Sequence, residues 1–128
     1  MKIRSYAKIN LGIEVLRKRE NHYHDIRTLF QAVDFCDVLE FRAAAGNGIR
    51  LSGNDKDIPW NEENLVYRAA RFLQLNYRGG GVEIHVDKRI PAGKGLGGGS
   101  SNAAMTLYAL NELWSLGLGR EELRRAAG

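Results

Sequence analysis

The hydrophobic and polar positions in the first half of the chain follow patterns typical of β-strands. Residues 3–15 mix β-branched and polar side chains, and residues 25–41 are rich in Leu, Val, Ile and Phe. Both compositions favour extended structure. An Asn-Gly pair at 47–48 is typical of a tight hairpin turn, and residues 49–51 then alternate between apolar and polar. We therefore expect two strands, a hairpin turn and a further short strand.

From about residue 59 the apolar positions change to the spacing of a helix. Apolar residues recur three or four positions apart, and glycines at 79–81 follow, which we expect to end the helix. The recurring residues are Leu65, Ala69, Phe72 and Leu73. A helix is therefore predicted between residues 59 and 79.

Residues 82–87 alternate strictly, which predicts a half-buried strand. One side carries Val82, Ile84 and Val86, and the other carries Glu83, His85 and Asp87. Beyond a glycine-rich stretch, residues 103–114 form an apolar stripe at helical spacing, made of Ala103, Leu107, Leu110 and Trp114. Glycines at 117 and 119 precede a further helix that runs toward residue 128. We expect one α+β domain, incomplete at its C-terminal end.

The composition is that of a globular domain, because 44% of the 128 residues are hydrophobic and 27% are charged. Cys36 is the single cysteine, which excludes an internal disulfide and favours a reduced, cytoplasmic setting, with Cys36 as a small core residue. No apolar run reaches the roughly 18 residues of a membrane span, and no signal peptide is expected. The net charge of +4 favours anionic partners, whether nucleotides, nucleic acids or sugar phosphates.

The sequence PAGKGLGGGSSNAA at 91–104 places glycines between the predicted strand and the predicted helix. The first N–H groups of a helix have no partner within it and carry partial positive charge, and glycine lets an anion approach the backbone. Ser100 and Ser101 can cap the helix or contact phosphate and a magnesium shell, while Lys94 adds a positive charge. This arrangement favours a phosphate site over the alternative, a flexible connector with a serine cap.

Two common phosphate motifs do not fit this stretch. The motif Gly-x-x-x-x-Gly-Lys-Ser/Thr is absent, because Gly93-Lys94 is followed by Gly95. The motif Gly-x-Gly-x-x-Gly occurs at Gly93, Gly95 and Gly98. A dinucleotide fold also needs a strand ending in an acidic residue about 20 positions on, and that region is helical or glycine-rich here. This second match alone is weak.

A third pattern, Pro-x-x-x-Gly-Leu-Gly-Gly-Gly-Ser-Ser-Asn-Ala-Ala over 91–104, resembles the second signature of the GHMP kinases. That family is named for galactokinase, homoserine kinase, mevalonate kinase and phosphomevalonate kinase. Residues 7–16 (AKINLGIEVL), 21–41 (NHYHDIRTLFQAVDFCDVLEF) and 64–73 (NLVYRAARFL) resemble the family too, in the family's order. The resemblance covers nearly the whole chain. It is greatest to the branch that phosphorylates a cytidine diphosphate-linked methylerythritol.

The resemblance implies a two-layer α+β fold, that of the GHMP kinase N-terminal, ATP-binding domain, which is ribosomal-protein-like with a left-handed βαβ crossover. Residues 1–128 would form this domain incompletely, and the C-terminal domain would be absent. The implied activity is phosphate transfer from ATP, with Mg²⁺, to the 2-hydroxyl of the cytidine-bearing substrate, in non-mevalonate isoprenoid synthesis in the cytoplasm. The implied partners are this small molecule and ATP, neither a nucleic acid nor a membrane, and no oligomeric state is implied.

Individual residues match the family's motifs for catalysis and substrate binding. Lys8 matches the catalytic lysine, which holds the acceptor hydroxyl and stabilises charge on the moving phosphoryl group; position alone would favour a surface lysine on an edge strand. Asn10 matches a substrate-contacting asparagine, or is a turn amide. Tyr23 and His24 match the pair that holds the cytidine with an aromatic face and a directional hydrogen bond. His22 replaces the glycine usual before them.

The nucleotide site implied by the resemblance joins Asn64 to the glycine-rich stretch. Asn64 matches a residue near the family's adenine pocket, or is simply a helix N-cap. Lys94 stands where the family more commonly has a small residue, and it reaches phosphate or points to solvent. The full ATP-binding set is Asn64, Pro91, Ala92, Gly93, Lys94, Gly95, Leu96, Gly97, Gly98, Gly99, Ser100 and Ser101.

The family's general base, an aspartate in a Gly-Ala-Asp-Val-Pro segment, has no counterpart in this sequence. No aspartate stands at a matching position, among Asp25, Asp34, Asp37, Asp55, Asp57 and Asp87. We therefore expect the chain alone to be inactive. No metal site is expected at His22 and His24, because no third ligand stands at motif spacing.

Two other functions remain as alternatives. One is a GHMP kinase of the homoserine or mevalonate type. The other is a basic RNA-binding α+β domain, which residues 82–90 disfavour because they present one apolar face and one of mixed charge.

Overall fold

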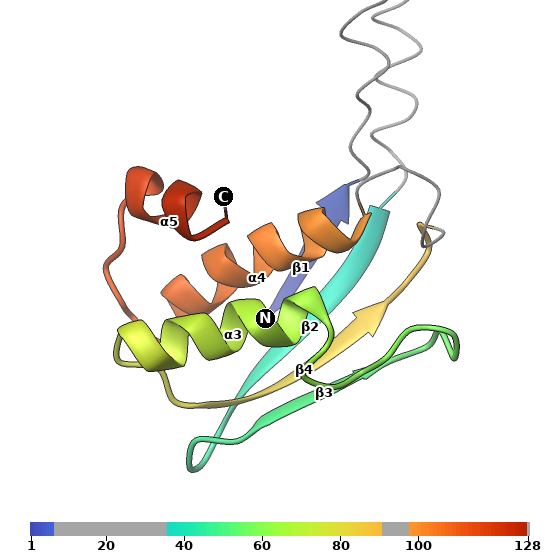
Figure 1. Cartoon of the computed structure of the whole chain (residues 1–128), viewed down its shortest axis with the longest axis horizontal. Coiled ribbons are helices and arrows are strands. Elements are labelled where there is room, and N and C mark those ends of the chain that lie inside the picture. Colours follow the sequence, from blue (N-terminus) through green and yellow to red (C-terminus); the bar gives the residue numbers. More distant parts are fainter. Residues whose placement is uncertain (7–35, 91–97, 128) are drawn as a thin grey trace, which may run out of the picture.

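The computed structural model describes residues 1–6, 36–90 and 98–127 of the chain. A four-stranded sheet forms one layer, helices α3 and α4 cover one of its faces, and α5 packs against them (Figure 1). The elements are β1 (Lys2–Tyr6), β2 (Cys36–Ala44), β3 (Ile49–Gly53), α3 (Leu65–Asn76), β4 (Gly81–Asp87), α4 (Gly98–Leu113) and α5 (Arg120–Ala127). The two-layer α+β class expected from the sequence is confirmed.

The strands are ordered β1-β2-β4-β3, so that β4 lies between β2 and β3. Strand β2 is antiparallel to both β1 and β4, whereas β3 runs parallel to β4. The prediction of a hairpin around residues 47–48 is therefore wrong. The chain does turn there, with Gly46 at a φ of +80°, but the strands on either side of the turn pair with β4 and not with each other. The local sequence accounts for the turn. The central position of β4 follows from its apolar inner face, which is buried in the core.

The other strand predictions hold where the structure describes them. The expected strand over 3–15 is seen as β1, and its remaining part lies outside the described residues. The strand expected over 25–41 is described from Cys36 and continues three residues further, to Ala44. Cys36 is half-buried at the start of β2 and not a fully buried core residue as expected.

Helix α3 connects the parallel strands β3 and β4 and so completes a βαβ unit, whose hand stays a prediction. It ends at Asn76, ahead of the glycines expected to stop it, where the Tyr77 amide donates to the carbonyl oxygen of Leu73. Its buried face is shifted from part of the expected stripe: Leu73 is buried as expected and Ala69 is half-buried, but Leu65 and Phe72 are not buried. Val66, Ala70 and Leu73 are buried, whereas Leu65 and Phe72 are 45% and 39% exposed.

This shift has a geometric reason. Positions 66, 70 and 73 form one row of the helix facing the sheet, while Leu65 and Phe72 lie in the next row, which faces α4. There they line a hollow of about 360 Å³ together with Ala103 and Leu107.

The core lies between the sheet and the helices. Alternate residues of β2 and β4 point into it, and from α4 it takes Leu107 and Leu110, two members of the expected stripe; Ala103 and Trp114 are half-buried. Leu123 of α5 closes one side, and the expected final helix is confirmed. The buried hydrophobic residues are Leu39, Phe41, Val66, Ala70, Leu73, Val82, Ile84, Val86, Ile90, Leu107, Ala109, Leu110 and Leu123. Of the helices that the structure describes, none has the length and apolar content needed to cross a membrane.

Gly53, at the end of β3, has no room for a side chain. A Cβ atom there would lie 2.0 Å from the ring of Trp60, and the ring is held in place because its Nε1 donates to the carbonyl oxygen of Asp55 at 2.9 Å. We expect Gly53→Ala to lower the free energy of unfolding by about 1–3 kcal/mol. Urea unfolding measures it. Gly48→Ala is the control, since a Cβ at Gly48 would meet nothing within 4 Å; equal stabilities of the two variants would contradict the packing.

Candidate functional site

The ends of several elements meet at one edge of the sheet. Strands β1, β3 and β4 end at this edge and β2 begins there, as the register of the pairs requires. Helices α3 and α4 both begin at the same end of the molecule (Figure 1). A Cβ atom on Gly99, in the first turn of α4, would lie 3.8 Å from Cδ1 of Leu65, the first residue of α3. Two helix N-termini are therefore side by side.

A hydrogen bond joins α4 to β1 at this edge. The Ser5 hydroxyl donates to Oγ of Ser101 at 2.8 Å, and Ser5 is fully buried. Because Ser5 is three residues before Lys8 in the chain, this bond ties the strand that leads to the predicted catalytic lysine to the start of α4. Ser101 faces β1 through this contact.

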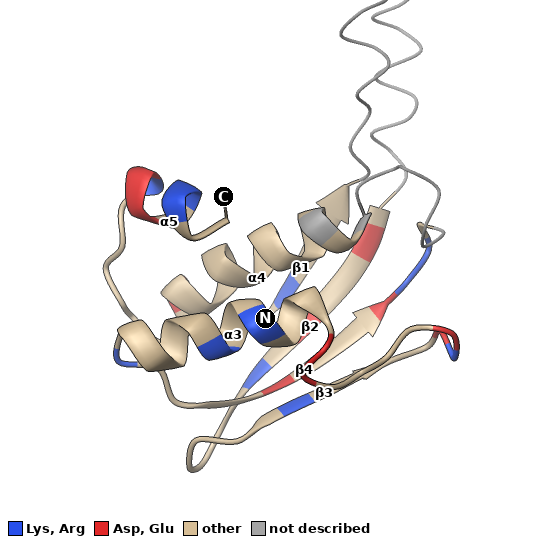
Figure 2. Ribbon diagram, viewed as in Figure 1, with Lys and Arg blue, Asp and Glu red and all other residues tan. Residues whose placement is uncertain are grey.

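The N-terminal end of α4 carries no acidic residue in its first turn. Its one charged residue, Glu112, lies near the other end, and the helix is almost free of charge in Figure 2. The partial positive charge of a helix N-terminus is therefore not offset by an acidic side chain of the helix itself. Gly99 is exposed there, and a Cβ atom on it would make only an ordinary contact with Leu65 among the described residues. An anion can approach this end of α4 closely.

The three residues after β4 are fixed from two sides. The amide of Lys88 donates to Oδ1 of Asn54 at 2.7 Å, while the amides of Arg89 and Ile90 both donate to Oδ1 of Asp37 at 2.6 and 2.8 Å. The Lys88 ammonium pairs with Oδ2 of Asp37 at 2.5 Å. Asp37 is fully buried and the Lys88 side chain is only 5% exposed. The chain thus leaves β4 along a defined path toward the glycine-rich stretch.

The predicted residue Asn64 takes the position of the N-cap of α3. Its Oδ1 accepts from the amide of Val66 at 2.9 Å, and its Nδ2 donates to the carbonyl oxygen of Pro59 at 2.9 Å. Both ends of the side-chain amide are therefore engaged in fixing the helix start. The structure places Asn64 beside Leu65 and so next to the first turn of α4.

The other predicted site residues divide into two groups. Gly98, Gly99, Ser100 and Ser101 form the first turn of α4, so the helix follows the strand as predicted but begins two residues before the serines expected to open it. Outside the described residues lie Lys8, Asn10, Tyr23, His24, Pro91, Ala92, Gly93, Lys94, Gly95, Leu96 and Gly97.

Sequence reasoning missed three polar residues at this edge. Asp37 and Ser5 are fully buried, and Asn102 is 3% exposed with an Oδ1 that has no hydrogen-bond partner among the described residues. A signal for Asp37 was present, because it shares the inner face of its strand with Leu39 and Phe41 at a spacing of two. A charged residue in such a row is buried at a cost unless it is paired, which marks it for attention.

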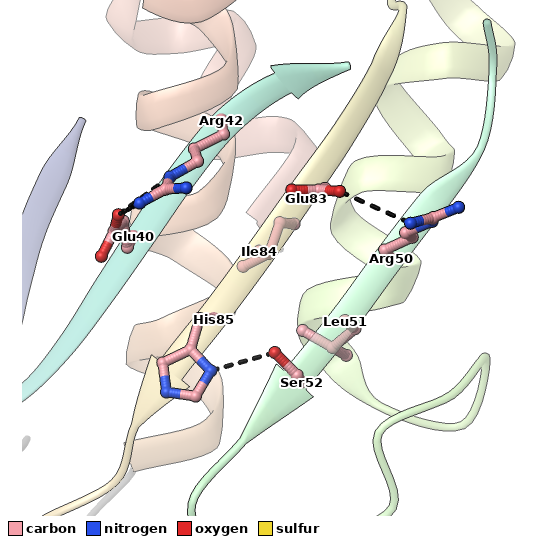
Figure 3. Close-up of a pocket in the computed structure, with 8 residues that line it drawn as sticks. All are labelled: Glu40, Arg42, Arg50, Leu51, Ser52, Glu83, Ile84 and His85. Carbon is pink, nitrogen blue, oxygen red and sulfur yellow. Dashed lines mark hydrogen bonds and ion pairs between the residues drawn. The ribbon is translucent and has the colours of Figure 1, made fainter. Parts of the chain in front are cut away.

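A second hollow, of about 370 Å³, lies on the outer face of the sheet, away from the helices (Figure 3). Its charged side chains pair with each other: Arg42 with Glu40 at 2.9 Å and Arg50 with Glu83 at 3.6 Å. The hydrogen bond from Arg42 lowers the pKa of the Glu40 carboxyl below its usual value. The polar face expected for β4 is confirmed here.

His85 lies in the same hollow, where its Nδ1 is 2.9 Å from the Ser52 hydroxyl. All of these side chains are exposed or half-buried. The hollow is a solvated sheet face, separate from the edge where the helices begin.

Nothing in the described part of the chain forms a protein-only metal site, since no three His, Cys, Asp or Glu side chains there are grouped closely enough to hold an ion.

Comparison with known proteins finds relatives that match nearly all of the chain. A protein of Methylococcus capsulatus called 4-diphosphocytidyl-2-C-methyl-D-erythritol kinase is 52% identical over 119 residues, covering 91% of this chain and 40% of its own. A crystal structure of 4-(cytidine 5'-diphospho)-2C-methyl-D-erythritol kinase matches with a TM-score of 0.67 at 31% identity, covering 100% of this chain and 46% of its own. Homoserine kinase from Cytophaga hutchinsonii matches with a TM-score of 0.63 at 28% identity, covering 72% and 31%.

These relatives are longer proteins: the chain spans 40–45% of the length of the curated proteins that it matches. The family described as GHMP kinases N terminal domain matches residues 64–128, which contain α3, β4, α4 and α5. With this match and with relatives that cover nearly all of its residues, the chain belongs to the GHMP kinases.

Proposed function

We propose that this chain supplies the nucleotide-binding part of an ATP-dependent kinase that phosphorylates the 2-hydroxyl of 4-diphosphocytidyl-2-C-methyl-D-erythritol. The observation that carries the proposal is the set of relatives with this substrate in their names, which are 41–52% identical over 91–99% of the chain. The site is the edge of the sheet where α3 and α4 begin. A cytoplasmic setting and a role in isoprenoid synthesis go with this assignment.

The reaction needs a hydroxyl oxygen to form a bond to the γ-phosphorus of ATP while the bond from that phosphorus to the β–γ bridging oxygen breaks. ADP leaves, and a base accepts the hydroxyl proton. In this proposal Lys8 holds the hydroxyl and the migrating phosphoryl group, and Asn10, Tyr23 and His24 bind the substrate. The base lies outside the matched motifs of residues 1–128.

The described residues fit a triphosphate at the start of α4. Gly99 leaves the backbone open to a ligand, and no acid in the first turn repels one. The ATP site in this proposal extends from Asn64 across residues 91–101. Mg²⁺, when bound with ATP, offsets phosphate charge. Mg²⁺ takes few protein ligands when phosphates hold it, so in this proposal the nucleotide carries the metal.

The alternatives are less well supported. The homoserine kinase structure covers 72% of the chain at 28% identity, whereas the relatives that act on the cytidine-bearing substrate cover almost all of it at much higher identity. Membership of a kinase family disfavours an RNA-binding domain.

A negative charge placed at residue 99 should affect nucleotide binding and folding stability in opposite directions. An aspartate in the first turn of a helix stabilises that helix, but here it would lie where the phosphates bind. We expect Gly99→Asp to weaken ATP binding by about tenfold or more without lowering the melting temperature. Gly99→Asn, of the same size and neutral, is the control. Titration calorimetry with ATP measures both; equal affinities for Asp and Asn would place the phosphates elsewhere.

Substrate choice should depend on the cytidine. We expect His24→Ala to weaken binding of the cytidine-bearing acceptor by about 1–3 kcal/mol, since a hydrogen bond to the base is lost, with the KM for ATP unchanged. His85→Ala, on the outer face of the sheet, is the matched control and should change neither. If homoserine or mevalonate proved the better acceptor for the natural protein, the substrate assignment would fail and the kinase assignment would stand.

Residues 1–128 alone should show no turnover. They span less than half of the relatives, and a general base contributes about 10²–10⁴-fold to such a reaction. The assay compares ADP release by this chain and by the longer kinase of Methylococcus capsulatus that it matches, at equal concentration. Comparable turnover would place the base within residues 1–128.

A further inference from the structure

Among the described residues, Asp37 is a charged group that is fully buried and has three polar partners. It lies on β2, on the face that packs against the helices, and its exposed fraction is 0%. One carboxylate oxygen accepts both the Arg89 and Ile90 amides, and the other pairs with the Lys88 ammonium. All of these partners belong to the three residues between β4 and the glycine-rich stretch.

These contacts decide the direction of the chain after β4. In the antiparallel pair of β2 and β4, Val38 and Asp87 form the last pair, and no strand pairing continues beyond them. The amides of the next residues turn to side-chain acceptors, Asn54 for Lys88 and Asp37 for Arg89 and Ile90. A buried acceptor that takes two successive amides fixes two peptide planes at once, because an unpaired buried amide is costly.

We propose that Asp37 is a positioning residue for nucleotide binding: through the Arg89 and Ile90 amides it holds the last described residues before the glycine-rich stretch. This inference rests on the proposed function, in which the N-terminal end of α4 binds the phosphates of ATP. Asp37 itself touches no nucleotide. Its effect is to hold one side of the site, while the Ser5–Ser101 hydrogen bond holds α4 on the other side.

Two double variants separate the backbone contacts from the ion pair. D37N/K88Q removes both charges and keeps an oxygen at position 37 that can accept the two amides, with a glutamine at 88 that can bond the new amide group. D37A/K88Q removes the charges and the acceptor together. The two variants differ only at position 37, and both are made in the natural protein.

We expect D37A/K88Q to raise the KM for ATP by about 10–100-fold, as the loss of one or two buried hydrogen bonds implies, with the KM for the acceptor changed less than about threefold. D37N/K88Q should keep the KM for ATP within about threefold of the wild type. Glu83→Ala removes an exposed carboxylate of the same strand β4, which pairs with Arg50 on the outer face of the sheet, and it should leave both constants unchanged.

A purely structural role would give a different result. The active fraction, and hence kcat, would then fall in D37A/K88Q with both KM values unchanged, and that outcome would overturn the proposal. If D37A/K88Q does not fold, D37N/K88Q decides alone, since a rise of more than about tenfold in its KM for ATP contradicts the role of the backbone contacts. A wild-type protein that bound no ATP would overturn the proposed function first, whereas equal KM values for ATP in the two double variants would overturn only the role of Asp37.

Discussion

The direction of β3 and β4 constrains everything at the candidate site. The two strands are parallel neighbours, so their C-terminal ends lie at the same edge of the sheet. A helix that follows a strand and packs back over its sheet must begin at the edge where that strand ends. Helix α3 follows β3 and α4 follows β4, and so their N-termini come together by topology. Two positive helix ends at one place favour an anion there before any side chain is chosen, which supports the proposed phosphate site.

This edge also contains an ion pair that is almost completely buried, between Asp37 and Lys88. Taking a carboxylate and an ammonium out of water costs several kcal/mol, which their attraction offsets only with good geometry and further hydrogen bonds. Asp37 has both, in Lys88 and the two backbone amides. An apolar pair of similar volume could stabilise the fold as well, but it could not accept the amides of Arg89 and Ile90. The polar contact therefore specifies a chain path that apolar packing would leave open.

Local patterns predicted most of the elements, and long-range contacts account for what was missed. The alternation in β4 and the stripe on α4 are properties of one segment, and both were found. The position of β4 between β2 and β3 depends on which strands pair, and an Asn-Gly turn carries no such information. On α3, Leu73 was placed correctly, but Leu65 and Phe72 were wrongly placed on the buried face because they are as apolar as the residues that face the sheet. Only contact with α4 distinguishes the two rows.

The residues of the candidate site also divide into those that local sequence predicted and those that depend on long-range contacts. The presence of α4 after the glycine-rich stretch was predicted, because strand, glycines and helix are adjacent in sequence, but its start at Gly98 was not. Ser5 and Asp37 were missed as site residues, since their partners are 96 and more than 50 positions away. Lys8, Tyr23 and His24 rest on the resemblance to the family and stay predictions.

The charges of the two last helices show what the site requires of α4. Helix α5 has Glu121 and Glu122 in its first turn and Arg124 and Arg125 in its last, which complements its dipole at both ends. Helix α4 is twice as long and has neither feature. Each such charge typically contributes 0.3–1 kcal/mol, roughly the value of one surface ion pair. A helix that served only to cover the sheet would gain from an acid at Gly99 or Ser101. Helix α4 itself supplies no acid to offset its positive end, which lies beside the start of α3, and in the proposed function the phosphates of ATP neutralise this charge.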